Sequence, residues 1–413
     1  MNAARILFVD DEPRVLEAIE RMLFERRDRW DLVFCHDARQ ANRTLSASPV
    51  DIVVSDMRMP GEDGASLLGH VQNFYPDVVR IVLSGQMDEE TALRAAPVAH
   101  RFISKPCDGE ALEAMLDHIC ALRESLPFPD LRGLVGGLDV LPAFEPSHRA
   151  LRRALEEPQV NLQEVGNLLE QDMALCAKLL QLLNSSFFGH ADNAQDVREG
   201  VLHLGTDMVR RLALSLEVFR YSGQLLQIPG FAMPEIQQHS VLTARVARRI
   251  LGGAEQDAQQ AYVAGLLHDV GRLIMAATMP GSAGIALQAA HNHPEPLDAA
   301  ERDLLGADHS DLGAYLLGLW SLPQTVVKAV AGHHRPLDTA EVEQELVNGQ
   351  PGVRLAVQIA DVLAQEEADQ HGVQEGGPVD LAYLHDLGLG DRLDEWRALT
   401  AHQARLVAED PHG

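Results

Sequence analysis

The hydrophobic residues follow two different patterns along the chain. In the first part, short apolar runs at Ile6–Val9, Ile52–Val54, Val78–Leu83 and Arg101–Ile103 alternate with stretches of helical periodicity. The first three runs are apolar on both faces, as strands buried in a parallel sheet require. This alternation predicts an α/β domain with a doubly wound parallel sheet over residues 1–122.

A change of composition separates this part from a helical remainder. Residues 126–137 hold two prolines and three glycines, which should interrupt any helix, so we expect a linker at 123–137. Beyond it the periodicity is helical at 162–183, 201–218, 236–251, 258–277 and 312–319. We expect an all-α domain at 138–336 and a C-terminal extension at 337–413, with an exposed acidic loop at 338–352 and a helix at 353–365.

Charge and cysteine content limit the binding partners and the cellular compartment that we expect. The 413 residues include 34 basic and 61 acidic side chains, so the net charge is −27, which opposes binding to nucleic acid or an anionic membrane. We expect neither partner, because the sequence also has no basic recognition helix. The four scattered cysteines, with no signal-peptide pattern and no apolar run of about 20 residues, lead us to expect a cytoplasmic protein.

Polar residues follow the predicted strands at the edge where parallel strands end. Asp10 and Asp11, then Asp56, Ser84 and Lys105, stand at these positions. Crowded carboxylates raise one another's pKa unless a cation lies between them, and oxygen ligands suit Mg²⁺. Asp56 is the candidate nucleophile toward phosphorus, Asp11 and Asp10 the metal ligands, Lys105 the cationic partner of the phosphate, and Ser84 a hydroxyl donor to it.

The same residues carry a family resemblance. The segments 9–12 (VDDE), 51–61 (DIVVSDMRMPG) with Gly64, 83–85 (LSG) and 105–106 (KP) resemble, in order, the receiver domain of two-component response regulators over residues 4–122. The resemblance implies that Asp56 is the phosphoacceptor and that the Arg58 backbone carbonyl is a further Mg²⁺ ligand. It makes Ser84 and Phe102 the residues that switch on activation, and it implies a sensor histidine kinase or phosphotransfer protein as partner.

The helical part contains a second group of candidate ligands. These are His239, His268, Asp269, His309, His333, His334 and Asp361. Imidazole with carboxylate favours one or two ions of Fe, Mn, Co, Ni or Zn, and the adjacent pair 268–269 is expected on one helix. A single histidine on a helix is more often an ordinary core or surface residue. His291 and His293 fit no ligand position and are expected in a loop.

Motifs around these histidines carry a second resemblance. Residues 266–272 (LLHDVGR) resemble the signature of the HD superfamily of metal-dependent phosphohydrolases. Together with 172–185, 201–205, 239–240, 309, 320–323 and 333–334, they resemble the HDOD domain over 138–336. HDOD domains are regarded as acting through protein contacts, which makes an unknown downstream protein the implied partner. Asn184 and Ser185 are expected to end a helix and shape a contact surface.

Two functions stay open for the output domain. The first is a domain that binds another protein, and the alternative is a metal-dependent hydrolase of a cyclic nucleotide or other phosphoester, switched by the receiver. Arg272 stands where the active HD-GYP phosphodiesterases carry lysine, and no Gly-Tyr-Pro follows His333 and His334. Arg272 is therefore a candidate phosphate contact but a poor proton donor. The sequence leaves open whether the chain forms a homodimer.

Overall fold

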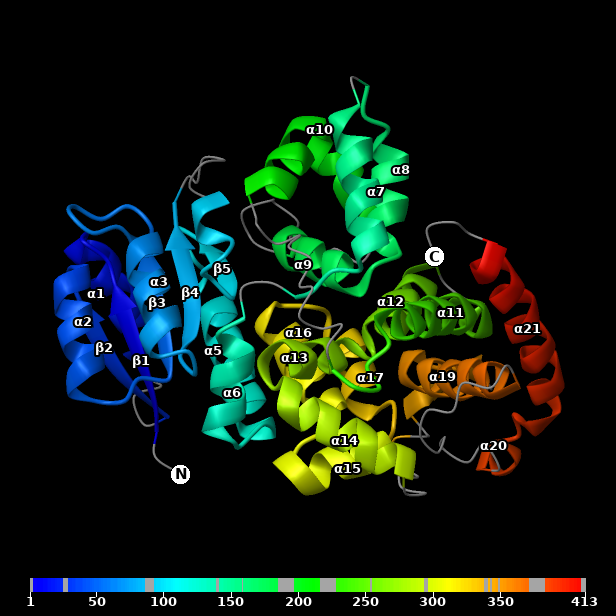
Figure 1. Ribbon diagram of the computed structural model, residues 1–413. Helices are drawn as coiled ribbons and strands as arrows, with labels where there is room; N and C mark the ends of the chain where they lie inside the picture. Colours follow the sequence, from blue (N-terminus) through cyan, green and yellow to red (C-terminus); the bar gives the residue numbers. More distant parts are fainter. Residues whose placement is uncertain are drawn as a thin grey trace.

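The computed structural model describes most of the chain in two joined parts (Figure 1). It describes residues 3–409 except for 25–28, 86–92, 139–140, 158, 185–196, 216–227, 253–254, 293–295, 338–340, 342–343, 348–349 and 371–382. Ser185, His293 and residues 216–218 of an expected helix therefore lie outside the described residues. None of the described helices is long and apolar enough to cross a bilayer.

The first part is built on a five-stranded sheet. Its strands are β1 (Ala4–Val9), β2 (Trp30–Cys35), β3 (Ile52–Asp56), β4 (Val79–Ser84) and β5 (Arg101–Ser104), in the order β2-β1-β3-β4-β5. All neighbouring pairs are parallel, which confirms the predicted α/β doubly wound fold. Strand β2 was not predicted from the sequence, although residues 32–35 (LVFC) are a continuous apolar run; this edge strand is only partly buried.

Helices cover both faces of the sheet. α1 (Pro13–Met22) and α5 (Gly109–Ser125) pack on one face, and α2 (Ala38–Ala47) and α3 (Gly64–Phe74) on the other. Aspartates cap three of these helices: the side chains of Asp37, Asp63 and Asp108 each accept a hydrogen bond from a backbone N–H of the first turn. The two layers leave the carboxyl ends of the strands at one edge of the domain.

The second part is helical and continues from a short helix in the linker. That helix is α6 (Pro129–Gly136), which follows the end of α5 at Ser125. The remaining elements are α7 (Glu145–Glu156), α8 (Leu162–Glu170), α9 (Met173–Leu183), α10 (Val197–Ser215), α11 (Met233–Leu251), α12 (Glu255–Leu267), α13 (Val270–Thr278), α14 (Pro280–Asn292), α15 (Leu297–Leu305), α16 (His309–Leu319), α17 (Gln324–Gly332), β6 (Leu346–Val347), β7 (Gln350–Pro351), α19 (Val353–Gln370), α20 (Tyr383–Asp386) and α21 (Leu393–Glu409). This confirms the predicted helical second domain.

Three local expectations were wrong in detail. The expected helix 162–183 is two helices, α8 and α9. The chain leaves the helical conformation after Glu170, and the Asp172 side chain caps α9 by accepting a hydrogen bond from the Leu175 N–H. The expected helix 258–277 is also two helices, α12 and α13, which meet at His268 and Asp269. The segment expected as an exposed loop at 338–352 contains the antiparallel pair β6–β7.

Polar contacts join the two parts. The buried Arg101 guanidinium of β5 donates to the Leu319 carbonyl at 3.1 Å and to the Gly318 carbonyl, at the C-terminal end of α16. From α9, Lys178 Nζ donates to the Ala96 carbonyl at 3.2 Å and Gln181 Nε2 to the Ala99 carbonyl at 3.1 Å. A cation at a helix C-terminus is favourably placed, so Arg101 fixes α16 against the sheet.

Candidate functional site

The first candidate site lies at the carboxyl edge of the sheet, where β1, β3 and β4 end. Asp56 is the last residue of β3 and Ser84 the last of β4, and both are buried. Lys105 Nζ pairs with Asp10 Oδ2 at 2.6 Å and with Asp56 Oδ1. Asp11 is half-buried beside them. The strand ends therefore bring the predicted phosphoacceptor, its lysine and the acids of β1 into one cluster.

Burial sets the electrostatics of Asp56. Desolvation raises the pKa of its carboxyl, the Lys105 ammonium and the Arg58 N–H at 2.6 Å oppose that rise, and the nearby Asp10 carboxylate adds to it. The pKa of Lys105 is raised because its bonds to Asp10 and Asp56 outweigh its own burial. Asp56 is thus held as an anion by one lysine among crowded acids, the setting that a divalent cation further relieves.

Two of the expected Mg²⁺ ligands lie together. Asp10 and Asp56 are each within ion-pair reach of the same Lys105 nitrogen, and their oxygens are of the type that Mg²⁺ prefers. Asp11 is next in sequence, and no described contact joins it to this pair. Arg58, whose carbonyl is the expected further ligand, follows Asp56 by two residues and is exposed. Phe102 is half-buried and packs with the core under α2 and α3, one residue from the interdomain Arg101.

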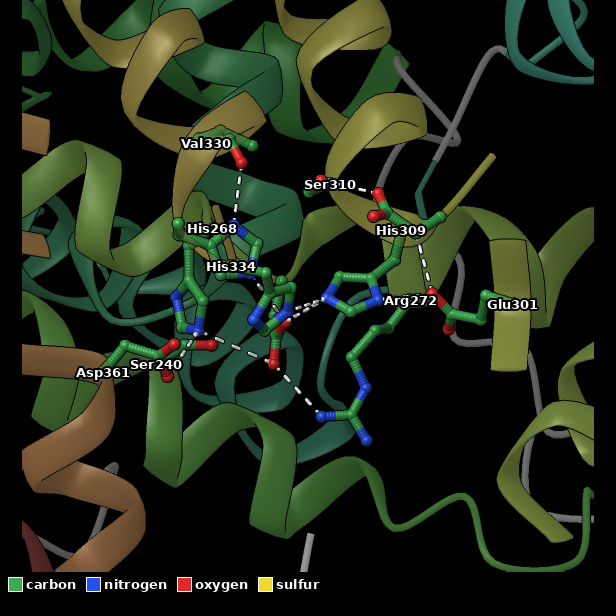
Figure 2. Close-up of polar contacts among 12 residues, drawn as sticks. Ser240, His268, Arg272, Glu301, His309, Ser310, Val330, His334 and Asp361 are labelled. Carbon is green, nitrogen blue, oxygen red and sulfur yellow. Dashed lines mark hydrogen bonds and ion pairs between the residues drawn. The ribbon is translucent and has the colours of Figure 1, made fainter. Parts of the chain in front are cut away.

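The second candidate site is a cluster of imidazoles and carboxylates in the helical part (Figure 2). All seven expected ligands come together in two sets, each with ligand atoms within 4.8 Å: Asp269 with His309, His333 and His334, and Asp361 with His239 and His268. His268 Nε2 lies 3.7 Å from Asp269 Oδ2 and 3.6 Å from Asp361 Oδ1, so it stands between the sets. The two sets adjoin, and each has donor atoms close enough together to hold an ion.

Hydrogen bonds turn three imidazoles toward the centre. The Nδ1 atoms of His268 and His333 lie 2.7 Å from the Gly265 and Val330 carbonyls, and that of His309 lies 2.5 Å from Glu301 Oε2. An Nδ1–H donor leaves the Nε2 lone pair free for an ion. His333 Nε2 is buried without a hydrogen-bond partner, and His309 and His334 face each other through Nε2 at 2.8 Å. The donor set therefore fits transition ions.

The pKa shifts in the cluster follow from burial and opposite charge. Burial, then the neighbouring His309, lowers the pKa of His334 to about 4, and burial also holds the pKa of His333 well below its usual range. Despite burial, Glu301 and Asp269 raise the pKa of His309 to about 10. Two imidazoles are thus neutral and ready to ligate, whereas an ion at His309 displaces a proton.

Glu301 is a functional residue that the sequence analysis missed. It lies on α15 and is buried, and its Oε2 also accepts the backbone N–H of His309 at 2.8 Å. A carboxylate behind a ligand histidine fixes the ring and raises its basicity. In the sequence, Glu301 is an acid beside Ala300 in a short helix, eight residues before His309. No spacing rule distinguishes such an acid from one on the surface.

Three expectations for this region change. His268 and Asp269 lie in the turn between α12 and α13 instead of on one helix, and the turn lets both side chains face the cluster. His291 is in the last turn of α14, exposed, and not in a loop. Arg272 is buried and its guanidinium donates to Asp269 Oδ2 at 3.1 Å, so it stands behind the cluster's carboxylate.

One helix connects the two candidate sites. α16 begins at His309, a member of the second cluster, and ends at Gly318 and Leu319, whose carbonyls accept from Arg101 of β5. Gly318 also lies under Leu122 of α5, where an added Cβ would come within 2.7 Å of the leucine side chain. The 11 residues of α16 thus join the β5–α5 face to the second cluster.

Known proteins resemble both parts. The family model of the response regulator receiver domain matches residues 6–117, and that of the HDOD domain matches 141–336. An uncharacterized protein of Treponema pallidum is 27% identical over 54% of this chain and 43% of its own length. The response regulator GtcR of Aneurinibacillus migulanus is 32% identical over 30% of this chain and 49% of its own length. The chain spans less than half the length of these curated relatives.

A solved structure is also similar to this chain. The crystal structure of the MmoQ response regulator from Methylococcus capsulatus is 25% identical, covers 63% of this chain and 98% of its own, and has a TM-score of 0.48. The sheet order, the acid cluster with its lysine, and the helical domain with its histidines define a receiver joined to an HD-type output. The chain belongs to the response regulators that carry an N-terminal receiver domain and a C-terminal HDOD domain.

Proposed function

We propose that this response regulator takes a phosphoryl group on Asp56 and thereby controls a metal-dependent phosphohydrolase in its HDOD domain. The observation that carries the second half is the pair of ligand sets that share one buried cluster. The donor would be a sensor histidine kinase or a phosphotransfer protein. We place this exchange in the cytoplasm, which suits the four free cysteines.

The receiver step follows from its own residues. An Asp56 carboxylate oxygen attacks phosphorus, the bond from phosphorus to the donor breaks, and Lys105 stabilises the phosphoryl oxygens. Mg²⁺, which Asp10, Asp11, Asp56 and the Arg58 carbonyl would hold, supplies charge neutralisation when bound. Ser84 donates its hydroxyl to the transferred group, and Phe102 with the adjacent Arg101 carries the change toward α16.

The output step rests on the second cluster. Residues His239, His268, Asp269, His309, His333, His334 and Asp361 would hold one or two ions of Fe, Mn, Co, Ni or Zn, which supply Lewis acidity toward a phosphoester when bound. Arg272 holds Asp269 in place and neutralises charge beside the site. His239, His334 and Asp361 are the more accessible members, so a substrate would approach from their side.

The burial of the cluster favours a second output function, which is contact with a downstream protein. His268, His309 and His333 are each at most 2% exposed, so the site is deep for a substrate. A metal that only stabilises the fold, with output through contact with a downstream protein, is consistent with this burial. The two functions differ in turnover and not in metal content.

The receiver assignment is tested by phosphorylation. Protein incubated with Mg²⁺ and acetyl phosphate should gain one acid-labile phosphoryl group, seen by intact mass, and Asp56→Asn should gain none. Asp63→Asn, which changes an aspartate at a helix cap outside the cluster, is the matched control and should label normally. Equal labelling of the Asp56 variant contradicts the assignment.

The output assignment is tested by metal content and then by turnover. We expect about one or two transition ions per chain, lost in the His268→Ala, Asp269→Ala double variant while the helical content persists. Metal-free purified protein that also fails to take up Mn²⁺ or Fe²⁺ contradicts the metal site. Metal-loaded protein that hydrolyses neither cyclic dinucleotides nor bis(4-nitrophenyl) phosphate, with or without acetyl phosphate, assigns the output to protein contact.

A further inference from the structure

A basic cavity lies away from both sites already described. It has a volume of about 770 Å³, and its lining residues come from α8, α10, α11 and α12, with Gln403 from α21. Four arginines line it: Arg198 from α10 and Arg245, Arg248 and Arg249 from α11. This volume is in the range of pockets that hold nucleotide-sized ligands.

The charges of the cavity do not cancel. Glu170 and Glu255 are the acids in its lining. Glu170 is buried and pairs with Arg198 at 2.5 Å, whereas Glu255 is exposed and pairs with Arg248 at 2.7 Å, a contact of little energy in water. Among the residues that line the cavity, four are arginines and two are carboxylates, in a chain whose net charge is −27.

Helix stability alone does not account for this arrangement. Arg248 and Arg249 lie in the last turn of α11, where the helix dipole favours cations. Arg245, however, is one turn earlier, at the i, i+3 and i, i+4 positions where like charges repel by a few tenths of a kcal/mol. Arg198 reaches the same cavity from another helix. Burial raises the pKa of Tyr262, and the charges of Arg245 and Arg198 are close enough to oppose this rise.

We propose that this cavity binds a small soluble anion with two or more phosphate groups, of nucleotide size. Guanidinium groups bind phosphate oxygens in pairs, and arginines from two helices can engage successive phosphates. The amide side chains of Asn167 and Gln403 are placed to bind the uncharged part of such a molecule. A concave pocket suits a small molecule better than an extended acidic protein surface. The proposal is independent of the metal cluster.

The direct test is calorimetric titration of the full chain at physiological ionic strength with inorganic tripolyphosphate, orthophosphate, ATP and GTP. We expect saturable binding of tripolyphosphate and at least one nucleotide, and weaker binding of orthophosphate. Arg245→Gln, Arg249→Gln should weaken tripolyphosphate at least about tenfold, as loss of two paired contacts implies. If no probe binds saturably, the proposal is wrong.

Matched variants separate this site from general charge effects and from the metal cluster. Arg152→Gln, Arg153→Gln removes the same charge from the exposed side of α7 and should leave affinity unchanged. His268→Ala, Asp269→Ala should also bind tripolyphosphate normally. Equal weakening in the α7 variant, or loss in the cluster variant, overturns the proposal. Exposed Arg249→Glu is a second variant: its circular dichroism checks folding, and unchanged affinity there likewise overturns the assignment.

Discussion

At the scale of single residues, the histidine and aspartate cluster is supported by a side chain that is not one of its seven candidate ligands. Glu301 accepts from both the ring and the backbone of His309, so it holds the imidazole and its tautomer in place. The other two rings that turn inward use backbone carbonyls for this purpose, which no substitution removes. Glu301 is therefore the position where this support can be changed without touching a ligand.

Glu301→Gln should weaken metal binding while leaving all ligands in place. The neutral amide is a poorer acceptor for the His309 ring, so we expect roughly a tenfold loss of Mn²⁺ affinity. Competition with a fluorescent chelator measures it. Asp303→Asn, on the exposed side of the same helix, is the control and should bind as the unaltered protein does. Equal affinities for the Glu301 variant and this control would show that Glu301 does not position His309.

Local sequence signals located the ligands but not what supports them. The acids could be identified because they follow predicted strands, and the seven candidate ligands because they lie at positions that resemble the HD and HDOD motifs. Glu301 could not, because its role depends on α15 folding back against the start of α16. Asp361 lies 92 residues beyond Asp269 in sequence, and only the packing of α19 on α11 brings it to His239 at 2.9 Å.

At the scale of elements, the turn between α12 and α13 shapes the cluster. Gly271 follows His268 and Asp269 at the start of α13, and its Cα faces the backbone of His309. A Cβ there would overlap the His309 carbonyl oxygen, so only glycine lets α13 and α16 approach this closely. The helical periodicity of 258–277 concealed this turn, since apolar residues continue through it.

Gly271→Ala should destabilise the helical part. The methyl group must push α13 from α16, at a cost of roughly 1–3 kcal/mol in the free energy of unfolding. Urea titration followed by circular dichroism measures it, and metal affinity should fall with it. Gly281→Ala on α14 is the control, because its Cβ would meet nothing within 4 Å and alanine favours a helix. Similar unfolding midpoints for the two variants would contradict the close approach.

Elements at the sheet edge illustrate the other limit of sequence reasoning. The buried strands β1, β3 and β4 were predicted because burial on both faces requires continuous apolar runs. β2 was not predicted although residues 32–35 are apolar, and its pairing with β1 is set by backbone bonds that side-chain patterns do not report. Side-chain patterns also do not report the break between α8 and α9 at Asp172, because the capping role of this residue depends on the direction of the backbone.

At the scale of the whole molecule, the receiver and the HDOD domain share a polar and apolar contact surface. Arg101, Lys178 and Gln181 bind backbone carbonyls across it, and Leu122 packs on Gly318. Such bonds depend on backbone position, so a small shift of β5 or α5 weakens several together. The proposed function requires that phosphorylation of Asp56 act on His309, and these contacts are where such a change would pass between the domains.

His118 makes this contact surface sensitive to pH. It lies on α5, and Gln324 Nε2 of α17 is 3.0 Å from its Nε2. Burial, helped by the Arg101 charge, lowers the pKa of His118 to about 4. Because the pKa in the docked state lies below the ordinary value of about 6.5, this contribution to docking is complete above that pH and is lost as the pH falls toward about 4.

Acidification should therefore loosen α5 from α17. The His118→Gln variant cannot gain a proton at this position, so its α5–α17 contact should weaken less than that of the unaltered protein. After allowance for solvent screening of this half-buried ring, we expect the two proteins to differ by about 1 kcal/mol in the docking free energy that they lose between pH about 7 and 4.5. Hydrogen exchange of the α5 and α17 amides, compared between the two proteins at each pH, measures it and cancels intrinsic exchange rates. His402→Gln on the exposed side of α21 is the control. Parallel exchange profiles in all three proteins would mean that His118 does not report on docking, and that acid acts elsewhere on the surface between the domains.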